Sequence, residues 1–177
     1  NLISFPLRSN LPITPELIQE WASGLSSKDY AKQWRAFERM SNFSDIHVLG
    51  LIQDFLLQDS GEPLLKTRFL QTLKKTCPTT LSFEVEKKGE RRVIKLAEVP
   101  VHLADWPVEY IHPLTTLEEK AYADPSLIEL ARELWLFFLE KNYPFYPDMS
   151  QELAWSASLH IHTLATINEE LANEQIK

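Results

Sequence analysis

The chain has 177 residues, of which 44% are hydrophobic and 11% aromatic, so it has enough apolar material for a globular core and is not intrinsically disordered. Its formal net charge of −7 disfavours nucleic acid as the main partner, because phosphate binding needs a positive surface. Four glycines and one cysteine argue against a phosphate-binding loop, a turn-rich β sandwich, a disulfide framework and a cysteine-based zinc site.

Helical signals begin at Thr14 and Pro15. Threonine is a good helix N-cap, and proline fits the first helical position, so a helix is predicted from residue 15, with Gly24 closing it. A second helix follows from about residue 27. Ser26 with Asp29 resembles a capping box that uses the shorter acid.

The second helix is predicted to carry an aromatic face, and its charged residues fall largely elsewhere. That face holds Tyr30, Trp34 and Phe37. A third helix is expected to start at Ser44 and to be apolar nearly all round, as a central helix is. Pro63 opens a fourth helix, and the short loop before it predicts that the third and fourth helices pack antiparallel.

The stretch FEVEKKGERRVIKLAEVP, residues 83–100, alternates like a strand on both sides of Lys88 and Gly89. A turn at these two residues sets Phe83 opposite Ile94 and Glu86 opposite Arg91, and a three-residue loop is the alternative because Lys-Gly is a weaker turn signal than Asn-Gly. One face is then mostly apolar and the other mostly charged, which is typical of a half-buried antiparallel pair. An isolated hairpin is marginal in water, so its apolar face is expected to cap the preceding helices. That face holds Leu81, Phe83, Val85, Ile94 and Leu96.

Residues 97–115 hold three prolines and are predicted to form an irregular connector that wraps the surface, with a turn at His112-Pro113. Thr116 with Glu119 is expected to start a short helix, and Asp124-Pro125 to start the next one. A last helix is predicted from about residue 150. Its apolar stripe consists of Leu153, Ala157, His160, Ile161, Leu164, Ile167 and Leu171.

The pattern predicts a mainly α fold of antiparallel helix pairs, like those of HEAT and tetratricopeptide (TPR) repeats, with one small antiparallel β-hairpin. Three regions are expected: an N-terminal helical region at 1–80, the hairpin and connector at 81–115, and a C-terminal helical region at 116–177. We expect them to form one compact unit.

A family resemblance rests on the order of an apolar helix pair, the segment EPLLKTRFLQTLKK, the strands FEVEKKG and RRVIKLAEVP, and the distal segment AWSASLH. This order resembles uncharacterised HEAT- and tetratricopeptide-like helical-repeat proteins of Gram-positive bacteria. The resemblance covers roughly a third of the chain, by loose apolar patterns. It implies a helical-repeat interaction protein and transfers no functional residues.

Candidate catalytic chemistry is sparse. His160 and His162 point to different sides of a helix, so they cannot chelate one metal ion, and Cys77 follows a helix C-terminus, where the helix dipole opposes a thiolate. No nucleophile elbow, P-loop, HExxH, calcium-loop or CxxC motif occurs. We therefore assign no catalytic, metal or cofactor residue.

We expect a cytoplasmic, non-enzymatic module that binds a protein or peptide, and no membrane span. The candidate partner-binding residues are Lys87, Lys88, Arg91, Arg92, Trp106 and Tyr110. The sequence favours the alternative interpretation for both groups, in which the basic residues form a charged ribbon that protects a strand edge and the aromatic residues pack in the core or the connector. The alternative function is a small-ligand-binding regulator or an enzyme with a site assembled between the helical regions.

Overall fold

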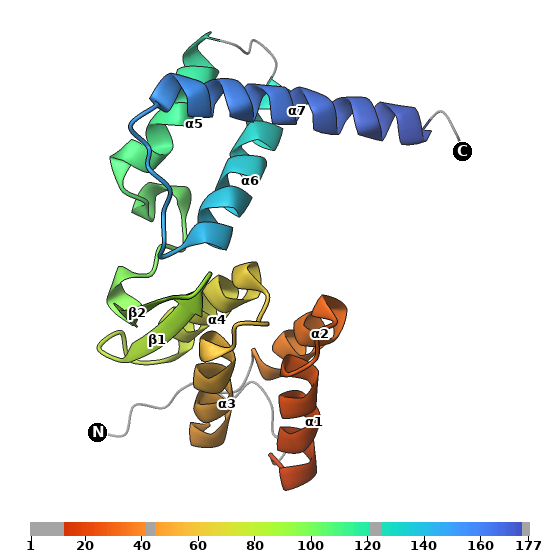
Figure 1. Ribbon diagram of the computed structural model, residues 1–177, viewed down its shortest axis with the longest axis vertical. Helices are drawn as coiled ribbons and strands as arrows, with labels where there is room; N and C mark the ends of the chain where they lie inside the picture. The colour runs from red at the N-terminus through yellow and green to blue at the C-terminus, as the bar shows by residue number, and fades with distance from the viewer. Residues whose placement is uncertain (1–12, 42–44, 121–124, 175–177) are drawn as a thin grey trace. The chain divides into compact units, whose positions relative to one another are not determined.

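A computed structural model describes residues 13–41, 45–120 and 125–174. This part of the chain is mainly helical with one two-stranded antiparallel sheet, which confirms the predicted fold class (Figure 1). In chain order the elements are α1 Pro15–Leu25, α2 Tyr30–Met40, α3 Ile46–Leu57, α4 Pro63–Thr76, β1 Ser82–Lys87, β2 Glu90–Lys95, η1 Leu96–Glu98, η2 Leu103–Asp105, α5 Val108–Lys120, α6 Pro125–Asn142 and α7 Glu152–Glu174.

The chain divides into two compact units, Asn1–Val99 and Pro100–Lys177. This division differs from the three regions expected from the sequence. The hairpin belongs to the first unit, because β1 packs against α3 and the short helical turn η1 packs against α4. The second unit begins at Pro100, and its first α-helix, α5, starts at Val108.

Local signals set the start of α1 and α2. Thr14 accepts a hydrogen bond from the Leu17 backbone through its side chain, and Pro15 takes the first turn, as predicted. The cap of α2 is Asp29, whose carboxylate accepts from the Ala31 N–H at 2.9 Å. The predicted pairing of Ser26 with Asp29 is therefore wrong, since Ser26 is the C-cap of α1.

Gly24 lies inside α1 and does not close it. A Cβ atom at this position would lie 2.9 Å from the Cβ of Ala36 on α2, closer than two carbon atoms can pack. The glycine therefore permits the close contact between α1 and α2. The expectation that Gly24 ends the helix was wrong, because α1 continues to Leu25.

A buried glutamine joins two loops of the first unit. The side chain of Gln33 donates to the backbone oxygens of Ser27 (2.6 Å) and Ser60 (3.2 Å), and it accepts from the Glu62 N–H at 2.8 Å. It lies on the buried side of α2, whereas Tyr30 of the predicted aromatic face is 53% exposed. A buried amide with all three contacts formed ties the α1–α2 loop to the α3–α4 loop.

The apolar core of the first unit centres on three phenylalanines. The ring of Phe69 on α4 meets Phe37 of α2 at 4.8 Å and Phe55 of α3 at 5.5 Å, both edge to face. Their contact holds the three helices together through the geometry that aromatic rings favour. Other fully or nearly buried members of this core are Trp21, Leu25, Val48, Ile52, Leu56, Leu65, Leu70 and Leu73.

The hairpin has the predicted register, with Phe83 opposite Ile94 and Glu86 opposite Arg91. Lys88 (φ 56°) and Gly89 (φ 80°) form the turn, and the two positive φ angles suit the tight turns of two-residue hairpins. Gln53 of α3 exchanges two hydrogen bonds with the backbone of Glu84 in β1. The apolar face is buried apart from Leu81, so the hairpin is held on the helices of its own unit (Figure 1).

In the second unit, α5 runs through the segment predicted to be irregular. The turn expected at His112-Pro113 and the helix start expected at Thr116 are both wrong, because all three residues lie inside α5. Pro113 has no N–H to donate to the preceding helical turn, which costs stability. The helix persists because it buries Leu114 and Leu117.

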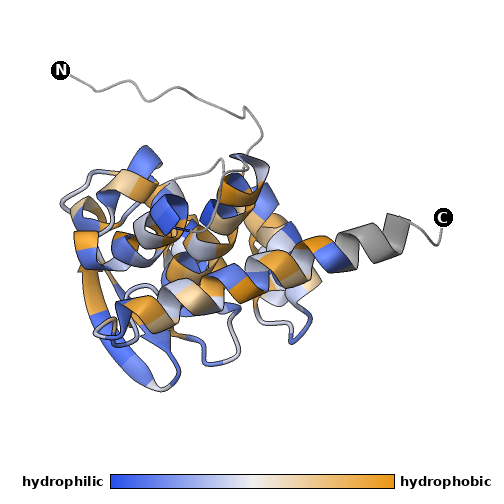
Figure 2. Cartoon of the chain, turned by 90° about the horizontal axis from the view of Figure 1, so that it is seen from above, coloured by the Kyte–Doolittle hydropathy of each residue, from blue (hydrophilic) through white to orange (hydrophobic). Residues whose placement is uncertain are grey.

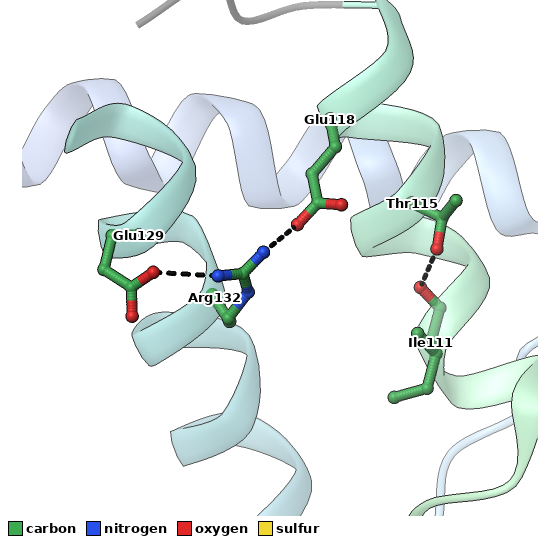
Figure 3. Close-up of polar contacts among 5 residues, drawn as sticks. All are labelled: Ile111, Thr115, Glu118, Glu129 and Arg132. Carbon is green, nitrogen blue, oxygen red and sulfur yellow. Dashed lines mark hydrogen bonds and ion pairs between the residues drawn. The ribbon is translucent and has the colours of Figure 1, made fainter. Parts of the chain in front are cut away.

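Arg132 of α6 connects two carboxylates on different helices (Figure 3). Its guanidinium donates to Glu118 of α5 at 2.7 Å and to Glu129 of α6 at 2.8 Å. The hydrogen bond with Glu118 is the main cause that raises the pKa of Arg132. These contacts join α5 to α6, since the ion pair with Glu118 crosses between the helices.

Candidate interaction surfaces

The basic residues of the hairpin do not form one exposed patch. Lys87 is buried, and its ammonium group donates to the Thr67 hydroxyl on α4 at 2.9 Å. Lys88, Arg91 and Arg92 are exposed, and the Arg91 guanidinium lies 3.7 Å from the carboxylate of Glu86. The sequence suggested a dense basic patch that included all four cations, but Lys87 is buried, so only Lys88, Arg91 and Arg92 of the four are exposed.

Trp106 and Tyr110, the two aromatic residues predicted to bind a partner, belong to an aromatic cluster within the second unit. The ring of Trp106 is buried and meets Tyr143 at 6.0 Å and Tyr146 at 5.8 Å. The ring of Tyr110 lies 4.3 Å from Tyr146, and its backbone oxygen accepts from the Trp135 indole at 2.6 Å. These contacts favour the packing interpretation over partner binding.

A groove of about 270 Å³ lies between α1 and α2. Its lining combines an apolar floor with charged side chains, and it consists of Glu20, Trp21, Gly24, Lys32, Arg35, Ala36 and Arg39. Arg39 donates to Glu20 across the groove. The three cations follow the spacing i, i+3 and i+7 of one helix face, and from the sequence they were expected only to lie away from the aromatic face.

The helix α7 exposes large apolar side chains in a row. Leu153, Ile161 and Leu164 are 68%, 64% and 40% exposed, and the exposed Ala157 lies between them. Figure 2 shows hydrophobic residues recurring along this helix. We call these four residues the α7 stripe. All four residues belong to the apolar stripe expected for the last helix, but the buried side of α7 carries Ser156, Leu159 and Thr163.

The α7 stripe borders a second groove, between α5 and α7, of about 220 Å³. Leu153 and Ala157 belong to both features. The groove is mainly apolar, and its other lining residues are Thr116, Leu117, Lys120, Ser156 and His160. At one end, Glu152 accepts from the Thr116 hydroxyl at 2.6 Å, which joins the start of α7 to α5.

The candidate reactive residues do not assemble into a recognised centre. In the described ranges, no group of three or more His, Cys, Asp or Glu side chains is placed to hold a metal ion. His160 is half-buried in the α5–α7 groove, and His162 is exposed. Cys77 is half-buried at the end of α4, 3.8 Å from the hydroxyl of its neighbour Thr76.

Among the described residues of the first unit, the most deeply buried cation is Lys66 on α4, which is 1% exposed. Its ammonium group donates to the backbone oxygens of Gln58 (2.5 Å) at the end of α3 and Glu86 (2.6 Å) in β1. It thereby joins three elements. Burial lowers the pKa of Lys66, and the charges of Glu86 and Asp59 partly oppose this shift.

The lowered pKa of Lys66 predicts a pH dependence of stability. Between the pKa in the folded chain and the unfolded value of 10.5, the unfolded state binds more protons, so stability rises with pH. We expect the difference in urea midpoint between the parent chain and Lys66→Met to increase from about pH 7 to about pH 10. Unfolding is monitored by circular dichroism. A midpoint difference that stays constant or decreases over this pH range would contradict the lowered pKa of Lys66.

The comparisons with known proteins bear on family membership alone. No curated protein and no solved structure gives a significant match to the chain. In the parts of the chain that the structure describes, no helix combines the length and hydrophobicity needed to cross a membrane. The model of one family, described as a protein of unknown function (DUF3196), matches residues 27–176. The match spans most of both units, and the chain therefore belongs to the DUF3196 family.

Proposed function

We propose that the protein is a non-enzymatic, cytoplasmic interaction module of helical-repeat type, which binds an amphipathic helix of a partner protein along the α7 stripe. The observation that carries this proposal is the exposure of Leu153, Ile161 and Leu164 on one side of a 23-residue helix. Contiguous exposed apolar surface is uncommon on monomeric proteins and marks interaction sites.

The geometry of the stripe fits a helical occupant. Its members recur every three or four residues, which places them in a line along α7, and a partner helix needs only the same spacing to pack against them. The adjoining α5–α7 groove offers an apolar recess beside Leu153 and Ala157, where a large side chain of the partner can be desolvated. Such recessed contacts supply most of the energy of an interface.

Introducing negative charge on the α7 stripe tests this proposal. We expect Ile161→Glu combined with Leu164→Glu to weaken partner binding by about 30-fold or more, because two carboxylates would be placed in an apolar interface. The fold should persist, since both side chains are exposed. Val93→Glu is the matched control, because Val93 on the hairpin is 65% exposed and Ile161 is 64% exposed.

The measurement combines a photo-crosslinking residue at Ile161 in the source cells with titration of the identified partner. The proposal predicts an adduct at a partner helix, a defined stoichiometry with the purified partner, and loss of binding in the double variant alone. Adducts only within this chain or to a second copy, absence of adducts, or equal binding by the double variant would contradict it.

A further inference from the structure

The groove between α1 and α2 is basic, although the chain as a whole is acidic. Three cations and one carboxylate line it, in a chain whose formal net charge is −7. Arg39 is paired with Glu20. Among the described residues, Lys32 and Arg35 have no carboxylate partner, so the groove keeps a local positive charge.

The positions of Lys32 and Arg35 do not favour helix stability, whereas Arg39 lies in the last turn of α2, where the helix dipole favours a basic side chain. Lys32 is the third residue of α2, in the first turn, where the helix dipole favours acidic side chains and disfavours basic ones. Arg35 and Arg39 are four residues apart on the same helix, a spacing at which like charges repel. Intramolecular contacts therefore account for Arg39, which is paired with Glu20, but not for Lys32 and Arg35, whose charges suit an anionic ligand.

The floor of the groove is apolar and firmly positioned. Trp21 is buried beneath it, and Gly24 holds α1 so close to α2 that no Cβ fits between them at this point. Gly24 and Ala36 both line the groove, and neither has a long side chain that could fill it. The site thus offers an apolar contact flanked by cations.

We infer that the α1–α2 groove binds an acidic helical peptide of a partner protein, with carboxylates facing Lys32 and Arg35 and an apolar side chain on the floor where Gly24 meets Ala36. Cations at i, i+3 and i+7 extend over about 10 Å of helix, and carboxylates at the same spacing on a second helix extend equally far. This site lies in the first unit and does not depend on the proposed role of the α7 stripe.

Selection from a displayed library of helical peptides, roughly 14 residues long with randomised surface positions, tests the inference on the full chain. We expect the enriched peptides to carry two or more Asp or Glu residues at helical spacing together with one large apolar residue. Fluorescence anisotropy of the best peptide should show binding that weakens as salt rises from about 0.05 M to about 0.5 M.

Paired variants identify the site. Lys32→Gln with Arg35→Gln should weaken the peptide about tenfold or more. Lys75→Gln with Lys95→Gln removes the same charge from exposed positions elsewhere in the first unit and should leave binding unchanged. Circular dichroism checks that both double variants fold.

Each other outcome overturns the inference. It fails if no peptide is enriched, if the enriched peptides are not acidic, or if both double variants bind alike. It also fails if inorganic phosphate or a single-stranded oligonucleotide binds the groove more tightly than any acidic peptide and loses binding in the Lys32 and Arg35 variant. The test is independent of the proposed function, because substitutions in the α7 stripe should leave the peptide affinity of this groove unchanged.

Discussion

Phe69→Ala is expected to lower the free energy of unfolding of the first unit by about 3–5 kcal/mol. Phe69 is 1% exposed and contacts the rings of both Phe37 and Phe55, so its removal leaves a cavity where α2, α3 and α4 meet. The surrounding helices cannot close this cavity fully, because each is already held by its own buried contacts. The loss therefore exceeds the transfer energy of the ring alone.

Hydrogen exchange of the α4 amides is the suitable measurement, because a chain of two compact units need not unfold in one step. Tyr30→Ala is the matched control, since Tyr30 lies on α2 but is 53% exposed, and its effect should remain within about 0.5 kcal/mol. Equal protection of α4 in the parent chain and in Phe69→Ala would show that the three-phenylalanine core does not hold the first unit together.

Phe83→Ala on the hairpin is expected to destabilise the same unit by about 3 kcal/mol, while Arg91→Ala changes stability by about 0–1 kcal/mol. Phe83 is buried opposite Ile94, whereas the Arg91 side chain is exposed and lies 3.7 Å from Glu86. A two-stranded sheet has little stability of its own, so the hairpin depends on this apolar face.

Protection of the β1 and α3 amides distinguishes the two variants. The interpretation predicts early exchange of both elements in Phe83→Ala, because Gln53 of α3 is bonded to the β1 backbone and β1 packs on α3. A loss confined to the strands would mean that α3 is stable without the hairpin. A large effect of Arg91→Ala would show that the ion pair, and not the apolar face, holds the hairpin in place.

The two proposed binding sites differ in chemistry, and this difference makes them separable. The α7 stripe is apolar, so binding there should depend weakly on salt, whereas binding to Lys32 and Arg35 should weaken as salt screens the charges. A partner that engages both units would bind more tightly than either site alone, through the raised effective concentration at the second site.

The sequence by itself determined the features that depend on neighbouring residues. Thr14 and Pro15 start α1, Pro63 starts α4, and the turn at Lys88 and Gly89 sets the hairpin register, all as predicted. Caps, first-turn prolines and two-residue turns act through bonds formed within one turn of chain. Such signals can be interpreted without knowledge of the tertiary contacts.

Only the tertiary structure decided which side of a helix is buried and whether a helix continues through a proline. α7 has apolar residues on more than one side, so the sequence could not select between the stripe and the side that holds Ser156 and Thr163. The Thr163 hydroxyl donates to the Leu159 backbone oxygen at 2.8 Å, which makes its burial tolerable. Pro113 remains inside α5 for a similar reason, since distant packing outweighs a local defect.

Buried polar residues and the basic groove lay equally beyond the sequence. Gln33, Lys66 and Lys87 occupy interior positions because backbone or hydroxyl oxygens from remote segments meet their polar groups. The spacing of Lys32, Arg35 and Arg39 was visible in the sequence, but their role depends on α1 packing against that side of α2. Contacts between segments far apart in the chain decide burial, and no local signal encodes their positions.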